Sequence, residues 1–295
     1  MKGKRTSNRI VIGVLMVMMS VAFGVTRQTV EATRLPAASD GERQALLQET
    51  GNPLSGQQGH RYDFLSAWPA ERVRRLEVWL AVGIRFEGPW ASEELDAVLQ
   101  VLDAFGALYG ERRFFELTDA ALGLRGDRNG RHLVFSRAPG YDVPAASWHS
   151  KSGQIVLNDG IFDREFRQRH YYWGFLRGKY AQPGPGITRR EVIIGHELGH
   201  VLVDGLRAEA AAEGYSQISL EGLYRHAIPA EQWPHGYART KENLVTEVAL
   251  WVLNIDRTPE AARFRADFLA TTIAGREWPH HVARSFALAS ADGAR

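Results

Sequence analysis

The strongest constraint on the fold is a pair of histidines, His196 and His200, within an apolar segment. Thr188 and Glu191 have the spacing of a capping box, which predicts a helix beginning at Arg189. Side chains four residues apart emerge from the same face of a helix, about 6 Å from one another. The helix also carries an apolar stripe, formed by Val192, Ile193, Val201 and Leu202. The segment therefore predicts a largely buried helix that presents two imidazoles side by side.

Two imidazoles at this spacing are typical of a zinc site, since both nitrogens can approach a zinc ion to about 2.0–2.1 Å. Glu197 follows the first histidine and is expected on the same side, where it would accept a proton from a metal-activated water. The plainer interpretation is an ordinary amphipathic helix, but its histidines would then be buried donors without partners. Gly195 and Gly199 are poor helix formers, so they indicate close approach of another backbone or of a substrate.

A catalytic zinc usually takes three protein ligands and leaves one position open. The chain has no cysteine, so the third ligand must be His, Asp or Glu. The metzincin continuation is absent, because Val203 and Leu206 occupy the positions of its glycine and third histidine. A later apolar helix over 242–252 is therefore the expected source, and it carries two carboxylates, Glu242 and Glu247.

Of these two carboxylates, Glu247 is the favoured ligand. Leu244, Leu250 and Trp251 flank it at helical contact spacing, and a carboxylate in such surroundings is costly unless a cation meets it. Glu242 stays open as the alternative, although an acid in the first turn is also stabilised by the helix dipole. The carboxylate that does not bind the metal would cap the helix or support a ligand.

Three features together resemble the lethal-factor-type zinc metallopeptidases, a branch of the gluzincins. They are His196-Glu-Leu-Gly-His200, the later Gly236-Tyr237-Ala-Arg-Thr240, and the acidic apolar helix that follows. The resemblance extends over roughly residues 150–260 and implies a zincin-like fold with one zinc ion, bound by the two histidines. It further implies that Glu197 is the general base and that Tyr237 donates a hydrogen bond to the developing oxyanion.

The resemblance does not choose between the two carboxylates. The family usually has its ligand glutamate seven residues after the tyrosine, and Leu244 holds that position here. Asp204, four residues after the second histidine, is a candidate to orient that ring, and His235 is an alternative to Tyr237 as donor. Residues Gln154 to Asn158 resemble the edge strand along which zincins bind an extended substrate by main-chain hydrogen bonds.

The rest of the body predicts an α+β fold with a small mixed sheet and a mostly helical C-terminal part. Apolar residues at helical spacing predict one helix opening at Trp68 and a second that Ser92 caps. Short strands are expected over 132–136 and 153–157, each followed by turn-forming residues. With the zincin resemblance, an edge strand is expected over the helix of the two histidines.

The N-terminus has the composition of a membrane-directed segment. Four basic residues precede the uncharged, largely apolar run Ile10 to Val25, which is the layout of a secretory signal or an N-terminal anchor. We expect residues 1–32 to be this segment, with Val30-Glu31-Ala32 as a rough cleavage site, and residues 33–60 to be a flexible tether. The metallopeptidase-like domain would then span 61–295, and membrane contact would come only from the N-terminal segment.

Charge and composition narrow the function classes. Without the four basic residues of the first 25, the chain has 32 basic and 34 acidic side chains, too balanced for a nucleic-acid-binding protein. Two functions remain. The first is an exported or membrane-anchored zinc endopeptidase acting on an extended peptide or protein substrate. The alternative is a zincin-shaped, non-catalytic binding or assembly protein of the cell envelope. An intact Glu197 favours the enzyme, because a structural metal site needs no general base.

Overall fold

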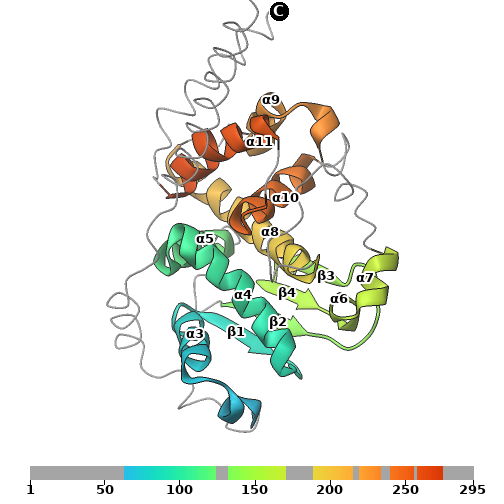
Figure 1. Cartoon of the computed structure of the whole chain (residues 1–295). Helices are drawn as coiled ribbons and strands as arrows, with labels where there is room; N and C mark the ends of the chain where they lie inside the picture. Colours follow the sequence, from blue (N-terminus) through green and yellow to red (C-terminus); the bar gives the residue numbers. More distant parts are fainter. Residues whose placement is uncertain are drawn as a thin grey trace, which may run out of the picture. The chain divides into compact units, whose positions relative to one another are not determined.

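Four short strands form a mixed sheet in the order β1-β2-β4-β3 (Figure 1). They are β1 (Ile84–Glu87), β2 (Leu133–Arg137), β3 (Ala146–His149) and β4 (Gln154–Leu157). Strand β2 pairs in parallel with both β1 and β4. Strand β3 pairs antiparallel with β4, with Ala146 opposite Leu157. The computed structural model describes residues 63–123, 132–170, 189–214, 219–233, 240–255 and 258–274.

Helices make up most of the remaining described chain. Before β4 they are η1 (Asp63–Ala67), α3 (Ala70–Ala81), α4 (Ser92–Tyr109) and α5 (Glu111–Gly123). After it come α6 (Asp159–Phe162), α7 (Arg164–His170), α8 (Arg189–Ala212), α9 (Leu220–Ala227) and η3 (Ala230–Gln232). The last are α10 (Thr240–Val252), α11 (Pro259–Phe264) and the π-helix η5 (Arg265–Ala274). The predicted α+β class, with a small mixed sheet and a mostly helical C-terminal part, is confirmed at this level.

The helix that carries the two histidines, α8, is the central element of the core. It packs against α4, α5, α10 and β3 (Figure 1). Its apolar residues are buried on several sides, as expected for a helix surrounded by other elements. These residues are Val192, Ile193, Ile194, Leu198, Val201, Leu202, Val203 and Leu206.

Two glycines allow neighbouring helices to approach α8 closely. A Cβ atom on Gly199 would lie 2.8 Å from the carbonyl oxygen of Val245 in α10. On Gly205 it would lie 2.2 Å from the carbonyl oxygen of Leu117 in α5. The prediction that Gly199 marks a close backbone approach is confirmed, and the approaching backbone belongs to the helix that carries Glu242.

The predicted edge strand is wrong. Residues Gln154 to Asn158 contain β4, which pairs with β2 on one side and β3 on the other, so its backbone is not free for a peptide. The edge strand on this side of the sheet is Ala146–His149, which folds back antiparallel on β4 through a tight turn. A four-residue strand has the same side-chain pattern at an edge as in the interior, so its sequence did not reveal its place.

The start of α4 also differs from the prediction. Ser92 is the first helical residue, and the cap position belongs to Ala91. The Ser92 hydroxyl instead accepts a hydrogen bond of 2.6 Å from the indole of Trp68, while the Glu94 carboxylate accepts one from the Ala91 backbone N–H. The carboxylate thus satisfies an N–H at the beginning of the helix, and the serine joins this helix to the segment before α3.

Several predictions fall outside the described residues. These are the N-terminal segment 1–32, the tether 33–60, the cap at Thr188, and the candidate oxyanion donors Tyr237 and His235. Within the described ranges, no helix has the length and apolar composition that crossing a membrane requires.

Candidate metal centre

Three potential metal ligands converge where α8 meets α10. The rings of His196 and His200 have centroids 4.9 Å apart and are almost perpendicular. One oxygen of Glu242, Oε2, lies 3.0 Å from Nε2 of His196 and 3.4 Å from Nε2 of His200. One nitrogen from each ring and one carboxylate oxygen all lie within 4.8 Å of one another, so the group could hold a metal ion.

The two histidines are where the helix pattern predicted them, whereas Glu242 is the second choice of the sequence interpretation. The favoured Glu247 lies at 0% exposure and accepts a hydrogen bond of 2.6 Å from Nε of Arg265. Five residues separate the two glutamates, which at about 100° per residue places them on different sides of α10. The buried Glu247 does meet a cation, as its surroundings predicted, but this cation is the guanidinium of Arg265 and not a metal.

Hydrogen bonds with the two histidines favour the ionised form of Glu242. Hydrogen bonds to His196 and then to His200 hold the pKa of its carboxyl well below the usual range, although partial burial opposes this shift. Its side chain is 33% exposed, whereas those of the two histidines are nearly buried. The carboxylate therefore lies at the side of the group that is open to solvent.

A buried threonine orients the first histidine. The Nδ1 atom of His196 lies 2.9 Å from the Oγ1 atom of Thr246, a fully buried residue on α10. The hydroxyl engages Nδ1, so the other ring nitrogen, Nε2, faces Glu242. Nε2 is therefore the nitrogen that would bind the metal. The sequence analysis missed Thr246, but its spacing of four residues from Glu242 places both on one face of α10 and was a usable signal.

Glu197 lies beside the group and contacts the sheet. The side chain is buried, and burial raises the pKa of its carboxyl, while the charge of His196 and a hydrogen bond from the backbone N–H of Trp148 lower it. The negative charge of Glu242 raises it further. Glu197 is thus held between α8 and the edge strand β3, next to the first histidine.

The backbone of β3 has an outward-facing side at Trp148. The N–H of Asn158 donates to the carbonyl of Ala145, which marks these two residues as a hydrogen-bonded pair. Hydrogen-bonded and non-bonded pairs alternate along an antiparallel ladder, so Ala146 and Trp148 direct their N–H and C=O groups away from β4. The N–H of Trp148 meets Glu197 on this outward side.

Asp204 does not orient His200 as predicted. Its contacts within the described chain are with the indole Nε1 of Trp148 at 3.1 Å, Arg207 at 3.0 Å and Lys241 at 3.3 Å. It lies one turn beyond His200 on α8, and its carboxylate accepts from Trp148 on β3 and from Lys241 on α10. The prediction of a supporting role for the ring is therefore wrong, and two of the three partners of Asp204, Trp148 and Lys241, are on other elements.

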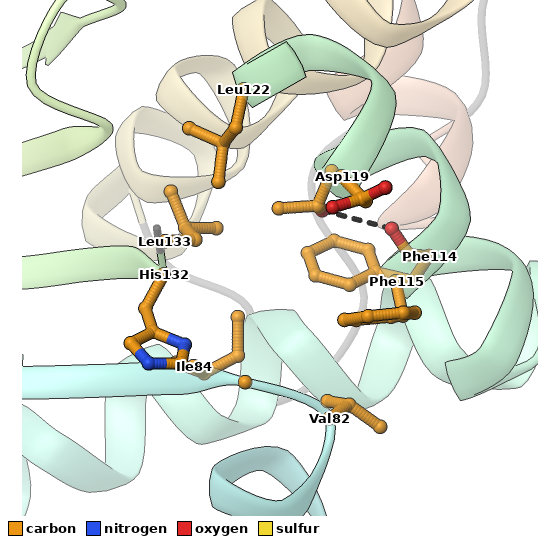
Figure 2. A pocket seen from close by; sticks show the side chains of 10 residues that line it. Val82, Ile84, Phe114, Phe115, Asp119, Leu122, His132 and Leu133 are labelled. Atoms are coloured by element: carbon orange, nitrogen blue, oxygen red, sulfur yellow. Dashed lines mark hydrogen bonds between the residues drawn. The ribbon is translucent and has the colours of Figure 1, made fainter. Parts of the chain in front are cut away.

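A small pocket lies elsewhere, between α5 and the first two strands (Figure 2). Its volume is about 20 Å³, room for roughly one water molecule. The lining is mostly apolar, with His132 and Asp119 as its titratable members, and burial together with the charge of Arg85 lowers the pKa of His132. None of the three converging ligands lines it, so the pocket is separate from the metal centre.

Comparison of the chain with protein-family models, with curated proteins and with solved structures found no match. The chemical interpretation of the site therefore depends on the arrangement of its own residues.

Proposed function

We propose that the protein is a zinc-dependent endopeptidase whose metal is held by His196, His200 and Glu242. The observation that carries this proposal is the convergence of two imidazole nitrogens and one carboxylate oxygen within 4.8 Å, from two helices that pack together. The buried carboxylate of Glu197 next to the first of these histidines distinguishes the arrangement from a purely structural site.

The residues fit a zinc ion by their chemistry. Two neutral imidazoles and one carboxylate are a common ligand set of catalytic zinc, and three protein ligands leave a position free. Thr246 presents the correct nitrogen of His196, and the partly exposed Glu242 leaves access from solvent. When bound, zinc acts as a Lewis acid that polarises a carbonyl and makes water acidic near neutral pH.

The proposed catalytic role of Glu197 is proton transfer. Its carboxylate would take a proton from the attacking water and pass it to the nitrogen of the leaving amine, so that water adds across the peptide bond. Tyr237, which the family resemblance implies as the donor to the oxyanion, keeps that role in the proposal. The outward-facing backbone groups of β3 other than the N–H of Trp148, which meets Glu197, would bind an extended substrate by main-chain hydrogen bonds.

The proposed setting is the exported or membrane-anchored one that the basic and apolar N-terminal segment indicates. If the chain binds zinc at His196, His200 and Glu242 but hydrolyses no peptide, its function would instead be that of the non-catalytic envelope protein.

The decisive experiment compares the full chain with its Glu197→Gln variant. Zinc is measured by metal analysis, and cleavage is measured on a library of extended peptides. We expect about one zinc in both proteins and proteolysis only in the wild type, because the amide cannot accept the proton. Hydrolysis that survives in Glu197→Gln would refute the mechanism, and a zinc-bound wild type without hydrolysis would support the non-catalytic function.

A further inference from the structure

Asp204 joins three elements around the proposed metal centre. Asp204 is buried, with 7% of the residue exposed. Its carboxylate accepts hydrogen bonds from Trp148 on β3, from Arg207 on α8 itself, and from Lys241 on α10. Burying a carboxylate costs free energy of desolvation, which charged or hydrogen-bonding partners must offset. Here the partners include residues of β3 and α10, the two elements that border the site.

On the β3 side, Trp148 is held at two points. Its indole N–H donates to Asp204 at 3.1 Å, and its backbone N–H donates to Glu197. The two acceptors are seven residues apart on α8, about two helical turns, and therefore lie along one side of the helix. Asp204 and Glu197 together fix the position of the edge strand against α8.

On the α10 side, Asp204 binds the residue that precedes the third ligand. Lys241 lies in the first turn of α10, where the helix dipole disfavours a cation. The ion pair with Asp204 at 3.3 Å offsets that cost and attaches the start of α10 to α8. Glu242 is the next residue, so this contact helps to set the distance between its carboxylate and the two histidines.

The third partner, Arg207, is shared with another element. It also forms an ion pair with Glu221 on α9, so its charge is divided between two carboxylates. Because Arg207 only partly balances the negative charge of Asp204, Lys241 acts as a second cation beside this carboxylate. This arrangement makes the α10 contact depend on charge, whereas the β3 contact needs only a hydrogen-bond acceptor.

We infer that Asp204 is a positioning residue of the proposed peptidase, with one contact that aligns the edge strand for substrate and another that places Glu242 for the metal. The inference rests on the proposed function. It goes beyond it by assigning separable effects to the two contacts: substrate binding depends on the bond to Trp148, and zinc affinity depends on the ion pair with Lys241.

The test uses four variants of the full chain and measures zinc affinity by chelator competition, and KM and kcat on a cleaved peptide. Trp148→Phe removes the indole N–H and is expected to raise KM about tenfold without changing zinc affinity. Lys241→Met removes the cation and is expected to weaken zinc binding about tenfold with KM unchanged. Asp204→Asn keeps an acceptor for the indole but loses the charge, so it should match Lys241→Met. Asp204→Ala should show both effects.

Glu209→Gln is the matched control. Glu209 also lies on α8 and binds Arg113 of α5 through two hydrogen bonds, and within the described residues it forms no hydrogen bond or ion pair with β3 or α10. It should lower thermal stability and leave zinc affinity and KM unchanged. The inference is overturned if Asp204→Ala behaves like this control, or if Asp204→Asn and Asp204→Ala are indistinguishable in both readouts.

Failure of the proposed function is distinguishable from failure of this inference. If the wild type binds zinc but cleaves no peptide, the peptidase proposal fails, whereas the zinc affinities of Lys241→Met and Asp204→Asn still test the α10 contact. Equal weakening of zinc binding in these two variants supports the contact, and unchanged affinity in either of them rejects it.

Discussion

Glu242 and Glu247 lie on one helix but have different partners, and this difference separates a proposed metal ligand from a structural ion pair. Glu242→Gln is expected to weaken zinc binding by at least about a hundredfold, since losing a ligand exceeds the loss of an outer partner. Because its side chain is partly exposed, the metal-free Glu242→Gln protein should lose less stability than Glu247→Gln. Glu247→Gln should keep zinc at saturating metal but lose about 3 kcal/mol, because Arg265 stays buried without its counter-charge.

Chelator competition and denaturant unfolding check this pair. The expectation fails if Glu247→Gln loses zinc while its fold is intact, or if Glu242→Gln binds zinc as tightly as the wild type.

Thr246 is expected to act on the proposed metal site through the hydrogen bond between its hydroxyl and His196. Thr246→Val conserves the shape but removes the hydroxyl that lies 2.9 Å from Nδ1 of His196. The ring is then free to change tautomer and orientation, so zinc affinity should fall ten- to about a hundredfold. Thr246→Ser keeps the hydroxyl and is the control. Equal zinc affinities of the valine and serine variants would show that the hydroxyl does not orient the ring.

At the scale of elements, the glycines of α8 set how closely its neighbours pack. Gly205→Ala places a Cβ atom 2.2 Å from the backbone of α5 and should cost about 3 kcal/mol, because a carbonyl cannot move aside without its helix. Gly195→Ala makes its tightest contact with the end of the Leu253 side chain, at 3.3 Å, and an ordinary contact with the Cβ atom of Ala249, at 3.5 Å. The gain of about 1 kcal/mol in helix propensity should offset that contact.

Free energies of unfolding in denaturant compare the two glycine variants. A Gly205→Ala protein as stable as Gly195→Ala would contradict the close packing of α5 against α8.

Among the described elements, the edge strand β3 is positioned by contacts with neighbouring elements. β3 has only four residues, and its outward backbone groups lie next to α8 because Trp148 is bonded to both Glu197 and Asp204. Trp148 lies within the strand, but the two acceptors that it needs, Glu197 and Asp204, lie on α8. The strand becomes a candidate substrate site through the helix beside it.

For the molecule as a whole, a metal at the proposed centre would join α8 to α10 and so couple binding to folding. A ligand that binds only the folded state stabilises it by about 2.7 kcal/mol when its free concentration is a hundred times Kd. Zinc should therefore raise the melting temperature of the full chain, and a chelator should reverse the effect. His200→Gln, which removes one of the three ligands, should show no such shift at the same zinc concentration. A shift of the same size in this variant would place the stabilising zinc elsewhere.

The sequence alone determined the elements whose pattern is local. Helix α8, its two histidines and Glu197 followed from a periodic apolar stripe and a spacing of four residues. The α10 helix and the strands β2 and β4 followed from patterns of the same kind. In each case the information lies within about ten consecutive residues, because side chains on one helix face or strand face are close in sequence.

The tertiary structure decided which distant residues meet. Both Glu242 and Glu247 belong to a correctly predicted helix, yet the choice between them depends on Arg265, eighteen residues later, which pairs with Glu247. The same holds for Asp204, whose partners Trp148 and Lys241 are far from it in the chain, and for β3, whose place at the edge depends on β4. These outcomes are set by how whole elements pack, since the rotation of a helix fixes every one of its side chains at once.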